Sequence, residues 1–140
     1  MRSETAERTL TWLLRLNGGL AATAIFAVFF PTDWIDTGSR LAGLGPFPDT
    51  ALTQYLARSV SAIYALLGAL ILYLAMDVRR YRDLIRVIGR LTILLGIALT
   101  AIDFAIGMPA GWSWGEGPPT IAVGLAIVWL AGLTRPRESS

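Results

Sequence analysis

The feature that most limits the fold of this chain is a set of four long apolar stretches. They occupy about residues 10–30, 50–76, 84–106 and 118–134 of the 140 residues. A helix needs roughly 20 mostly apolar residues to cross a bilayer, within a range of about 17–25. Because the bilayer core holds no water, each stretch must satisfy its backbone groups internally, which favours helices. We therefore predict an all-α integral membrane protein with a single domain of four transmembrane helices.

The composition agrees with this class and excludes several chemistries. Charged residues make up 16% of the chain, against about 25% in soluble domains. Cysteine and histidine are absent, which removes disulfides, thiol chemistry, the usual zinc sites and histidine-ligated haem. The chain has no lysine for Schiff bases, no familiar nucleotide-binding or hydrolase motif, and no surface suited to nucleic acid. We predict no catalytic residues, no metal site and no nucleic-acid partner. These absences favour a non-enzymatic protein without excluding an enzyme of unfamiliar type.

The arginines predict an orientation. Ten of the twelve fall on one side of the predicted membrane: Arg2, Arg8, Arg15, Arg79, Arg80, Arg82, Arg86, Arg90, Arg135 and Arg137. The positive-inside rule makes this side cytoplasmic, so both termini are predicted to be inside. The first ten residues mix Arg with Glu, and the apolar run continues beyond the small "AATA". We therefore expect the first helix to be retained rather than cleaved as a signal peptide.

Small residues recur along one face of two predicted helices. The 50–76 helix carries Ser61, Ala65, Gly68 and Ala75, and the 84–106 helix carries Gly89, Gly96 and Asp103 at steps of seven. Small residues allow membrane helices to approach closely. We predict an antiparallel four-helix bundle in which these two helices form a tight central hairpin. The same spacing predicts that Asp103 faces protein rather than lipid.

Two charges lie inside the predicted spans. At ~1.5 Å per residue, Arg58 lies about 12 Å and Asp103 about 6 Å below the outer ends of their helices. An unpaired charge near the bilayer centre costs at least ~2.5–3.5 kcal/mol on insertion scales, so such groups usually pair or face a cavity. Arg58 and Asp103 are the natural pair. One interpretation is that the pair only pins the two helices together.

The other interpretation makes this pair the floor of a pocket that opens to the outer face. A quinone, a lipid or another small apolar ligand suits apolar walls with a few convergent polar groups. The predicted ligand-binding residues are Arg58, Asp103, Glu116, Tyr55, Tyr64, Trp112 and Trp114, with Ser61 beside them. Glu116 also fits a solvated loop acid or an acid near a helix N-terminus, where the helix dipole favours it. Trp112 and Trp114 also fit interfacial anchors.

Two further segments have alternative interpretations. On the inner side, an arginine cluster would hold anionic lipid headgroups or serve only as a topology signal. Its members are Arg79, Arg80, Arg82, Arg86 and Arg90. The outer segment 31–49 contains "WIDTGSRLAGLGPF", which would either cap the bundle or rest on the bilayer surface.

Several short motifs resemble those of small four-helix bacterial membrane proteins of the BphX-like and DoxX-like kind. They are "ARS" and "YALLGA" in the 50–76 helix, "DVRRYRDLI" after it, and "D…GMP…W…EGP" at the end of the 84–106 helix. The resemblance covers nearly half of the chain and implies a bacterial inner membrane. DoxX-like proteins are associated with quinone-linked oxidation of sulfur compounds, usually as membrane subunits. The resemblance points to Arg58, Asp103 and Glu116, but a cysteine-dependent activity cannot carry over to a chain without cysteine.

Three functions therefore remain open. The first is a non-enzymatic inner-membrane protein that binds a quinone, lipid or similar molecule at the outer side, with no other cofactor. The second is an accessory or structural subunit, with membrane lipids, other membrane subunits or a second copy as partners. The third is a small proton- or ion-coupled transporter that uses Asp103 and Glu116, although no acid deep in the inner half completes a relay.

Overall fold

The computed structural model describes residues 3–134, and this part of the chain consists of helices joined by turns and short loops. The helices are α1 (Ser3–Ala22), α2 (Ala24–Ala27), α3 (Thr32–Leu41), α4 (Ala51–Leu74), α5 (Arg82–Ile106) and α6 (Ala110–Leu133). Four segments are long and apolar enough to cross a membrane: Ser3–Ala27, Ala51–Leu74, Arg82–Ile106 and Ala110–Leu133. For residues 3–134, the prediction of a helical fold with four candidate spans is confirmed. The predicted inner-side Arg2, Arg135 and Arg137 lie outside the described residues.

The described chain divides into two compact units. The first, which we call the α5–α6 unit, contains residues 3–16 and 72–134, and the second, the α4 unit, contains residues 17–71.

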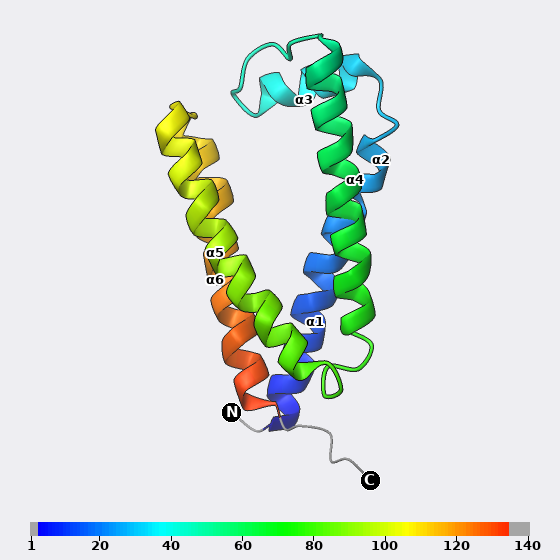
Figure 1. Ribbon diagram of the computed structural model, residues 1–140, viewed down its shortest axis with the longest axis vertical. Coiled ribbons are helices and arrows are strands. Elements are labelled where there is room, and N and C mark those ends of the chain that lie inside the picture. The colour runs from blue at the N-terminus through cyan, green and yellow to red at the C-terminus, as the bar shows by residue number, and fades with distance from the viewer. Residues whose placement is uncertain (1–2, 135–140) are drawn as a thin grey trace. The chain divides into compact units, whose positions relative to one another are not determined.

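The α5–α6 unit is built on a close antiparallel helix pair (Figure 1). A Cβ atom added at Gly96 would lie 2.9 Å from the carbonyl oxygen of Gly117, and one at Gly124 would lie 2.8 Å from that of Gly89. These contacts run in opposite order along the two helices, which makes the pair antiparallel. Close backbone approach of this kind supplies the van der Waals contact that holds helices together in lipid.

These glycines do not join the helices that the sequence pattern suggested. We predicted that they join the 50–76 and 84–106 helices, and this is wrong. Gly89 and Gly96 of α5 lie against α6, and Gly68 of α4 lies against α1, where its Cβ would be 2.6 Å from the carbonyl oxygen of Gly18. Heptad spacing identifies a small-residue face, but it does not identify the helix that meets this face.

Helix α6 begins at Ala110, earlier than the predicted start at residue 118. Pro118 and Pro119 were expected in the first turn but lie inside the helix. Proline lacks the N–H that would bond to the carbonyl four residues earlier, a cost that membrane helices can offset through neighbouring groups. Close packing against α5 at Gly117, between the prolines and the helix start, keeps this first part of α6 in place.

A well-packed apolar core lies at the end of the α5–α6 unit that carries the arginine cluster. Its most buried side chains include Ala6, Leu10, Leu14, Leu74, Val78, Ile85, Ile127, Leu130 and Ala131. Polar contacts close this end: Arg79 forms an ion pair with Glu7 at 2.6 Å, and the Nε of Arg82 donates to the carbonyl oxygen of Ala131 at 2.9 Å. Large apolar side chains elsewhere on the spans are exposed, for example Leu94 at 61% and Trp129 at 60%, as lipid-facing residues are.

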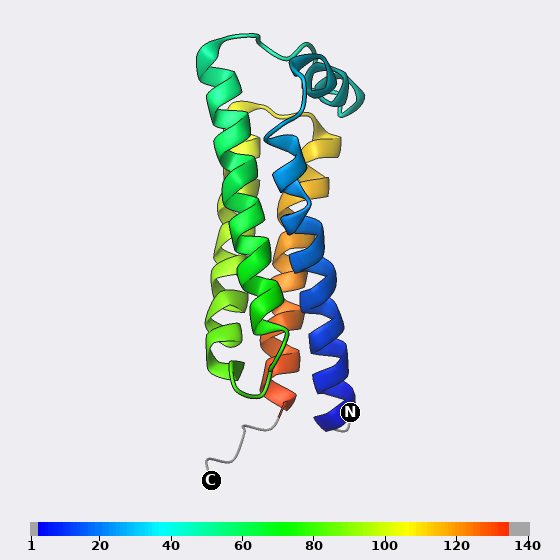
Figure 2. The ribbon, with the colours of Figure 1, turned by 90° about the vertical axis from the view of Figure 1, so that its right-hand side faces the viewer.

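In the α4 unit, the first helix breaks near Thr23 and continues as the single turn α2, which ends at Ala27. The chain then turns at Pro31 into α3, which runs across the direction of α4 near the start of that helix (Figures 1 and 2). The break leaves the carbonyl groups at the end of α2 without the donors of a continuing helix.

Candidate functional site

The candidate site is built around Asp103, in the last turn of α5. Its side chain is only 4% exposed, so the prediction that this acid faces protein is confirmed. Its Oδ2 has no hydrogen-bond partner, and it is the one buried side-chain oxygen or nitrogen within residues 3–134 in that position. A buried polar atom without a partner is costly, so its presence in a folded protein calls for an explanation.

Local structure explains why the backbone of Asp103 is satisfied while its side chain is not. Gly107 adopts the left-handed conformation, with φ of 72°, and ends α5. The N–H groups of Gly107 and Met108 donate to the carbonyl oxygen of Asp103, the second at 2.9 Å. The carboxyl group therefore lies at the C-terminal end of α5, where the helix dipole disfavours negative charge.

The register of the helix pair identifies the neighbours of this carboxyl group on α6. Because Gly89 faces Gly124 and Gly96 faces Gly117, the antiparallel register places Asp103 at the level of Ala110. Ser113 lies one turn further along α6 and is 3% exposed. Its hydroxyl makes only a long contact of 3.5 Å with the carbonyl oxygen of Pro109. Two buried polar side chains with little or no pairing therefore share one end of the α5–α6 seam.

The first turns of α6 also carry three of the predicted site residues. Trp112 Nε1 donates to the Oε2 of Glu116 at 2.7 Å, one helical turn away. Trp114 is 68% exposed on the same helix. The interpretation of Glu116 as a loop acid is wrong, because it lies inside α6 and its carboxylate has a partner. The interfacial position predicted for the tryptophans is untested and stays a prediction.

The remaining predicted ligand-binding residues lie on α4 in the other unit. Tyr55 is 67% exposed and Tyr64 is 40% exposed. The guanidinium of Arg58 donates to the carbonyl oxygen of Val28 through Nη1 and to that of Phe30 through Nη2, the latter at 3.1 Å. A cation at the end of a helix satisfies free carbonyl groups and complements the helix dipole. The predicted Arg58–Asp103 pair joins residues of different units and stays a prediction.

The arginine cluster makes several contacts within the protein besides those of Arg79 and Arg82. Arg86 approaches Asp83 at 3.9 Å, and Arg80 lies over the ring of Tyr81, 5.4 Å from its centroid. These contacts use part of the donor capacity of the cluster. The binding of lipid headgroups by the cluster stays a prediction.

Sequence reasoning overlooked Ser113 and the glycines of α6. The available signal was the pair Gly117 and Gly124, which are seven residues apart and match the spacing of Gly89 and Gly96 on α5. Because the last helix was predicted to start at residue 118, Ser113 was assigned to a loop. Gly117 was then outside the predicted helix, so its spacing to Gly124 was not considered.

Comparisons of the chain with protein-family models, curated proteins and solved structures give no match. The resemblance to BphX-like and DoxX-like proteins therefore stays a prediction. Within residues 3–134, no group of three Asp, Glu, His or Cys side chains lies close enough together to hold a metal ion.

Proposed function

We propose that this protein binds a small apolar molecule that carries one hydrogen-bonding group, such as a quinone or a lipid, in a bacterial inner membrane. The observation that carries the proposal is the buried, unpartnered Oδ2 of Asp103 at the α5–α6 junction. An unsatisfied carboxyl group inside a membrane destabilises the empty protein. A molecule that forms a hydrogen bond with this carboxyl group removes the destabilisation when it binds. Ligand binding would therefore explain why an acid is present at this position.

The chemistry of the site suits either form of such a ligand. An ionised Asp103 accepts a hydrogen bond from a quinol or lipid hydroxyl, and a protonated one donates to a quinone carbonyl. Ser113, which is equally buried, has a hydroxyl that both donates and accepts. Ile102, Phe104 and Ile106 are exposed on the same turns of α5, so the surroundings of the site are apolar and the ligand would arrive from the lipid phase.

In this proposal the cytoplasmic side is the one that carries the arginine cluster. Asp103 then lies in the outer half of the membrane, and the ligand enters from the outer leaflet. Trp114, exposed near the start of α6, fits the aromatic belt at this interface. The proposed function is binding alone, in which no bond is made or broken.

The test is native mass spectrometry of the protein in a mild detergent, with solvent extraction of what co-purifies. Asp103→Leu removes both the acceptor and the proton, whereas Asp103→Asn keeps hydrogen-bonding capacity without charge. Asp83→Asn is the matched control, because it changes an acid on the same helix whose side chain is 93% exposed. We expect a discrete apolar molecule with the wild type and with Asp83→Asn, and none with Asp103→Leu.

Retention by Asp103→Asn would show that hydrogen bonding is sufficient, and its loss would show that the carboxyl group itself is needed. Equal retention by Asp103→Leu, or a wild type that carries no discrete ligand, would overturn the proposal. A protein that purifies only with a larger partner would instead support the role of an accessory subunit.

A double-mutant cycle separates binding from simple helix pinning. The cycle combines Arg58→Gln with Asp103→Asn and measures the free energy of unfolding. Coupling well above ~0.5 kcal/mol, with unchanged ligand retention, would mean that the two residues only pin helices. Additive losses of stability, together with loss of the ligand, support the binding site at Asp103.

A further inference from the structure

Helix α3 has one apolar and one polar face. At 100° per residue, Trp34, Gly38 and Leu41 share one face, at steps of four and three. Asp36, Ser39 and Arg40 lie on the opposite side of the helix. This division is unrelated to the site at Asp103 and calls for its own explanation.

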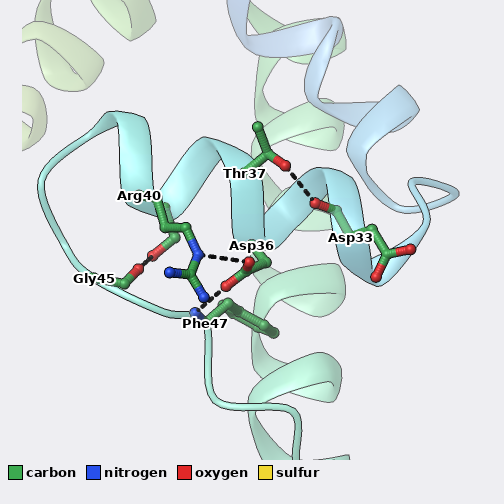
Figure 3. Close-up of polar contacts among 7 residues, drawn as sticks. Asp33, Asp36, Thr37, Arg40, Gly45 and Phe47 are labelled. Carbon is green, nitrogen blue, oxygen red and sulfur yellow. Dashed lines mark hydrogen bonds and ion pairs between the residues drawn. The ribbon is translucent and has the colours of Figure 1, made fainter.

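The polar side chains of α3 form hydrogen bonds with one another and with the loop that follows the helix (Figure 3). Arg40 Nε donates to Asp36 Oδ2 at 2.8 Å, and the backbone N–H of Phe47 donates to Asp36 Oδ1 at 2.7 Å. The hydroxyl of Ser39 donates to the carbonyl oxygen of Gly45 at 2.9 Å. The bond from Arg40, followed by the one from Phe47, holds the pKa of Asp36 below its ordinary value of 3.8. The loop is therefore folded back onto the polar side of the helix.

The apolar face of α3 is left uncovered. Trp34 is 62% exposed and Leu41 is 85% exposed. Phe30, just before the helix, extends this face, since its ring packs edge-on against Trp34 with centroids 5.3 Å apart. Contiguous exposed apolar side chains on a helix indicate a surface that something else covers.

The position of α3 in the chain identifies what covers this face. The candidate span Ser3–Ala27 ends a few residues before α3, and the candidate span Ala51–Leu74 begins after a short loop. Both ends of α3 are thus held at the boundary of the hydrocarbon region. Helix α3 runs across the direction of α4, so it follows the membrane plane where α4 crosses the membrane (Figures 1 and 2).

We propose that α3 is an interfacial helix whose apolar face, formed by Trp34 and Leu41, is inserted into the bilayer surface. Helices of this type bury their apolar face about 5–10 Å into the boundary between headgroups and acyl chains, and tryptophan favours this depth. The two acids and one arginine of α3 give it a net charge of −1, so anionic lipid is not required. Apolar contact with lipid of any headgroup is sufficient.

The chain contains no cysteine, so a thiol-reactive spin label attaches to a single-cysteine variant only at the introduced position. The test uses such variants. Trp34→Cys and Leu41→Cys report on the apolar face, and Thr32→Cys is the control on the opposite side of the helix. None of these changes removes the ion pair between Asp36 and Arg40. The labelled proteins are placed in phosphatidylcholine vesicles, and collision with oxygen and with a water-soluble nickel chelate is measured by electron paramagnetic resonance.

We expect labels at positions 34 and 41 to collide preferentially with oxygen, and the label at 32 to collide preferentially with the nickel chelate. This contrast should not change when the salt concentration is raised. Equal access of the nickel chelate to all three positions would place α3 in water and overturn the proposal. Labels at 34 and 41 that neither reagent reaches, with spin–spin broadening that unlabelled protein removes, would show that a second copy covers the face instead.

Discussion

A methyl group added at Gly124 should force α5 and α6 apart. A Cβ atom there would lie 2.8 Å from the carbonyl oxygen of Gly89 and 2.8 Å from the backbone nitrogen of Ile93. Both are backbone atoms, so no change of side-chain rotamer relieves the contact. Gly115 is the matched control, because it lies on the same helix and a Cβ atom there meets nothing within 4 Å.

The expected cost follows from this geometry. Ordinary contact at a Cβ atom begins at 3.4 Å, so the two helices must separate locally by 3.4 minus 2.8 Å, which is 0.6 Å. A gap of 0.5–1 Å already forfeits about a quarter to a half of each dispersion contact, and overpacking typically costs about 1–3 kcal/mol. Gly115→Ala loses no contact, and both substitutions gain the same helix propensity of up to ~1 kcal/mol, which cancels in the comparison. We therefore expect Gly124→Ala to be less stable than Gly115→Ala by about 1–3 kcal/mol.

The assay is reversible unfolding in mixed micelles, with the fraction of dodecyl sulfate as the denaturant and circular dichroism as the readout. Both variants are compared with the wild type under the same conditions. If Gly124→Ala and Gly115→Ala agree within ~0.5 kcal/mol, the two helices do not meet at these glycines, and the packing argument is refuted.

The remaining predictions concern the α4 unit. Because the folded-state pKa of Asp36 is lowered, its contribution to loop stability is fully present above the ordinary value of 3.8 and is lost only as the pH falls through the lower, folded-state pKa. The amide resonance of Phe47, which donates to this carboxylate, should therefore hold its position from neutral pH down to 3.8 and move below it, and movement between pH 5 and 7 would contradict the assignment. Arg58→Gln should cost about 1.5–3 kcal/mol of unfolding free energy, the usual value of a charge-assisted hydrogen bond, and an unchanged stability would mean that this side chain extends to the membrane surface instead.

The spans were predictable because hydropathy and length alone decide whether a helix can cross a bilayer, and no detail of packing enters. The start of α6 was not predictable in the same way. The segment "GWSWGEGPP" contains three glycines before its two prolines, a composition typical of a loop in water. In lipid the backbone must remain hydrogen-bonded within the segment, which favours the helix despite these residues. Propensities learned from soluble proteins therefore misplaced Glu116 and its neighbours.

The glycine faces show a second limit of sequence reasoning. The spacing of Gly89, Gly96 and Asp103 correctly predicted a small, protein-facing surface with a buried acid at its end. It did not predict the partner, because a small surface accepts any helix that presents a matching one. The matching surface on α6 includes Gly117, which lies before the predicted start of that helix at residue 118. It is recognisable only when the helix begins at Ala110.

The side chain of Arg58 has hydrogen-bond partners and the Oδ2 of Asp103 has none, and the difference has a physical reason. A guanidinium needs acceptors, and every broken helix supplies them as free carbonyl groups, here those of Val28 and Phe30. A carboxylate needs donors, and the N–H groups of an intact membrane helix are already engaged. An arginine near a helix break therefore finds backbone partners readily, whereas an acid at the C-terminal end of a helix does not. For this reason the binding proposal rests on Asp103, whose oxygen is left for a ligand to satisfy, and does not require Arg58.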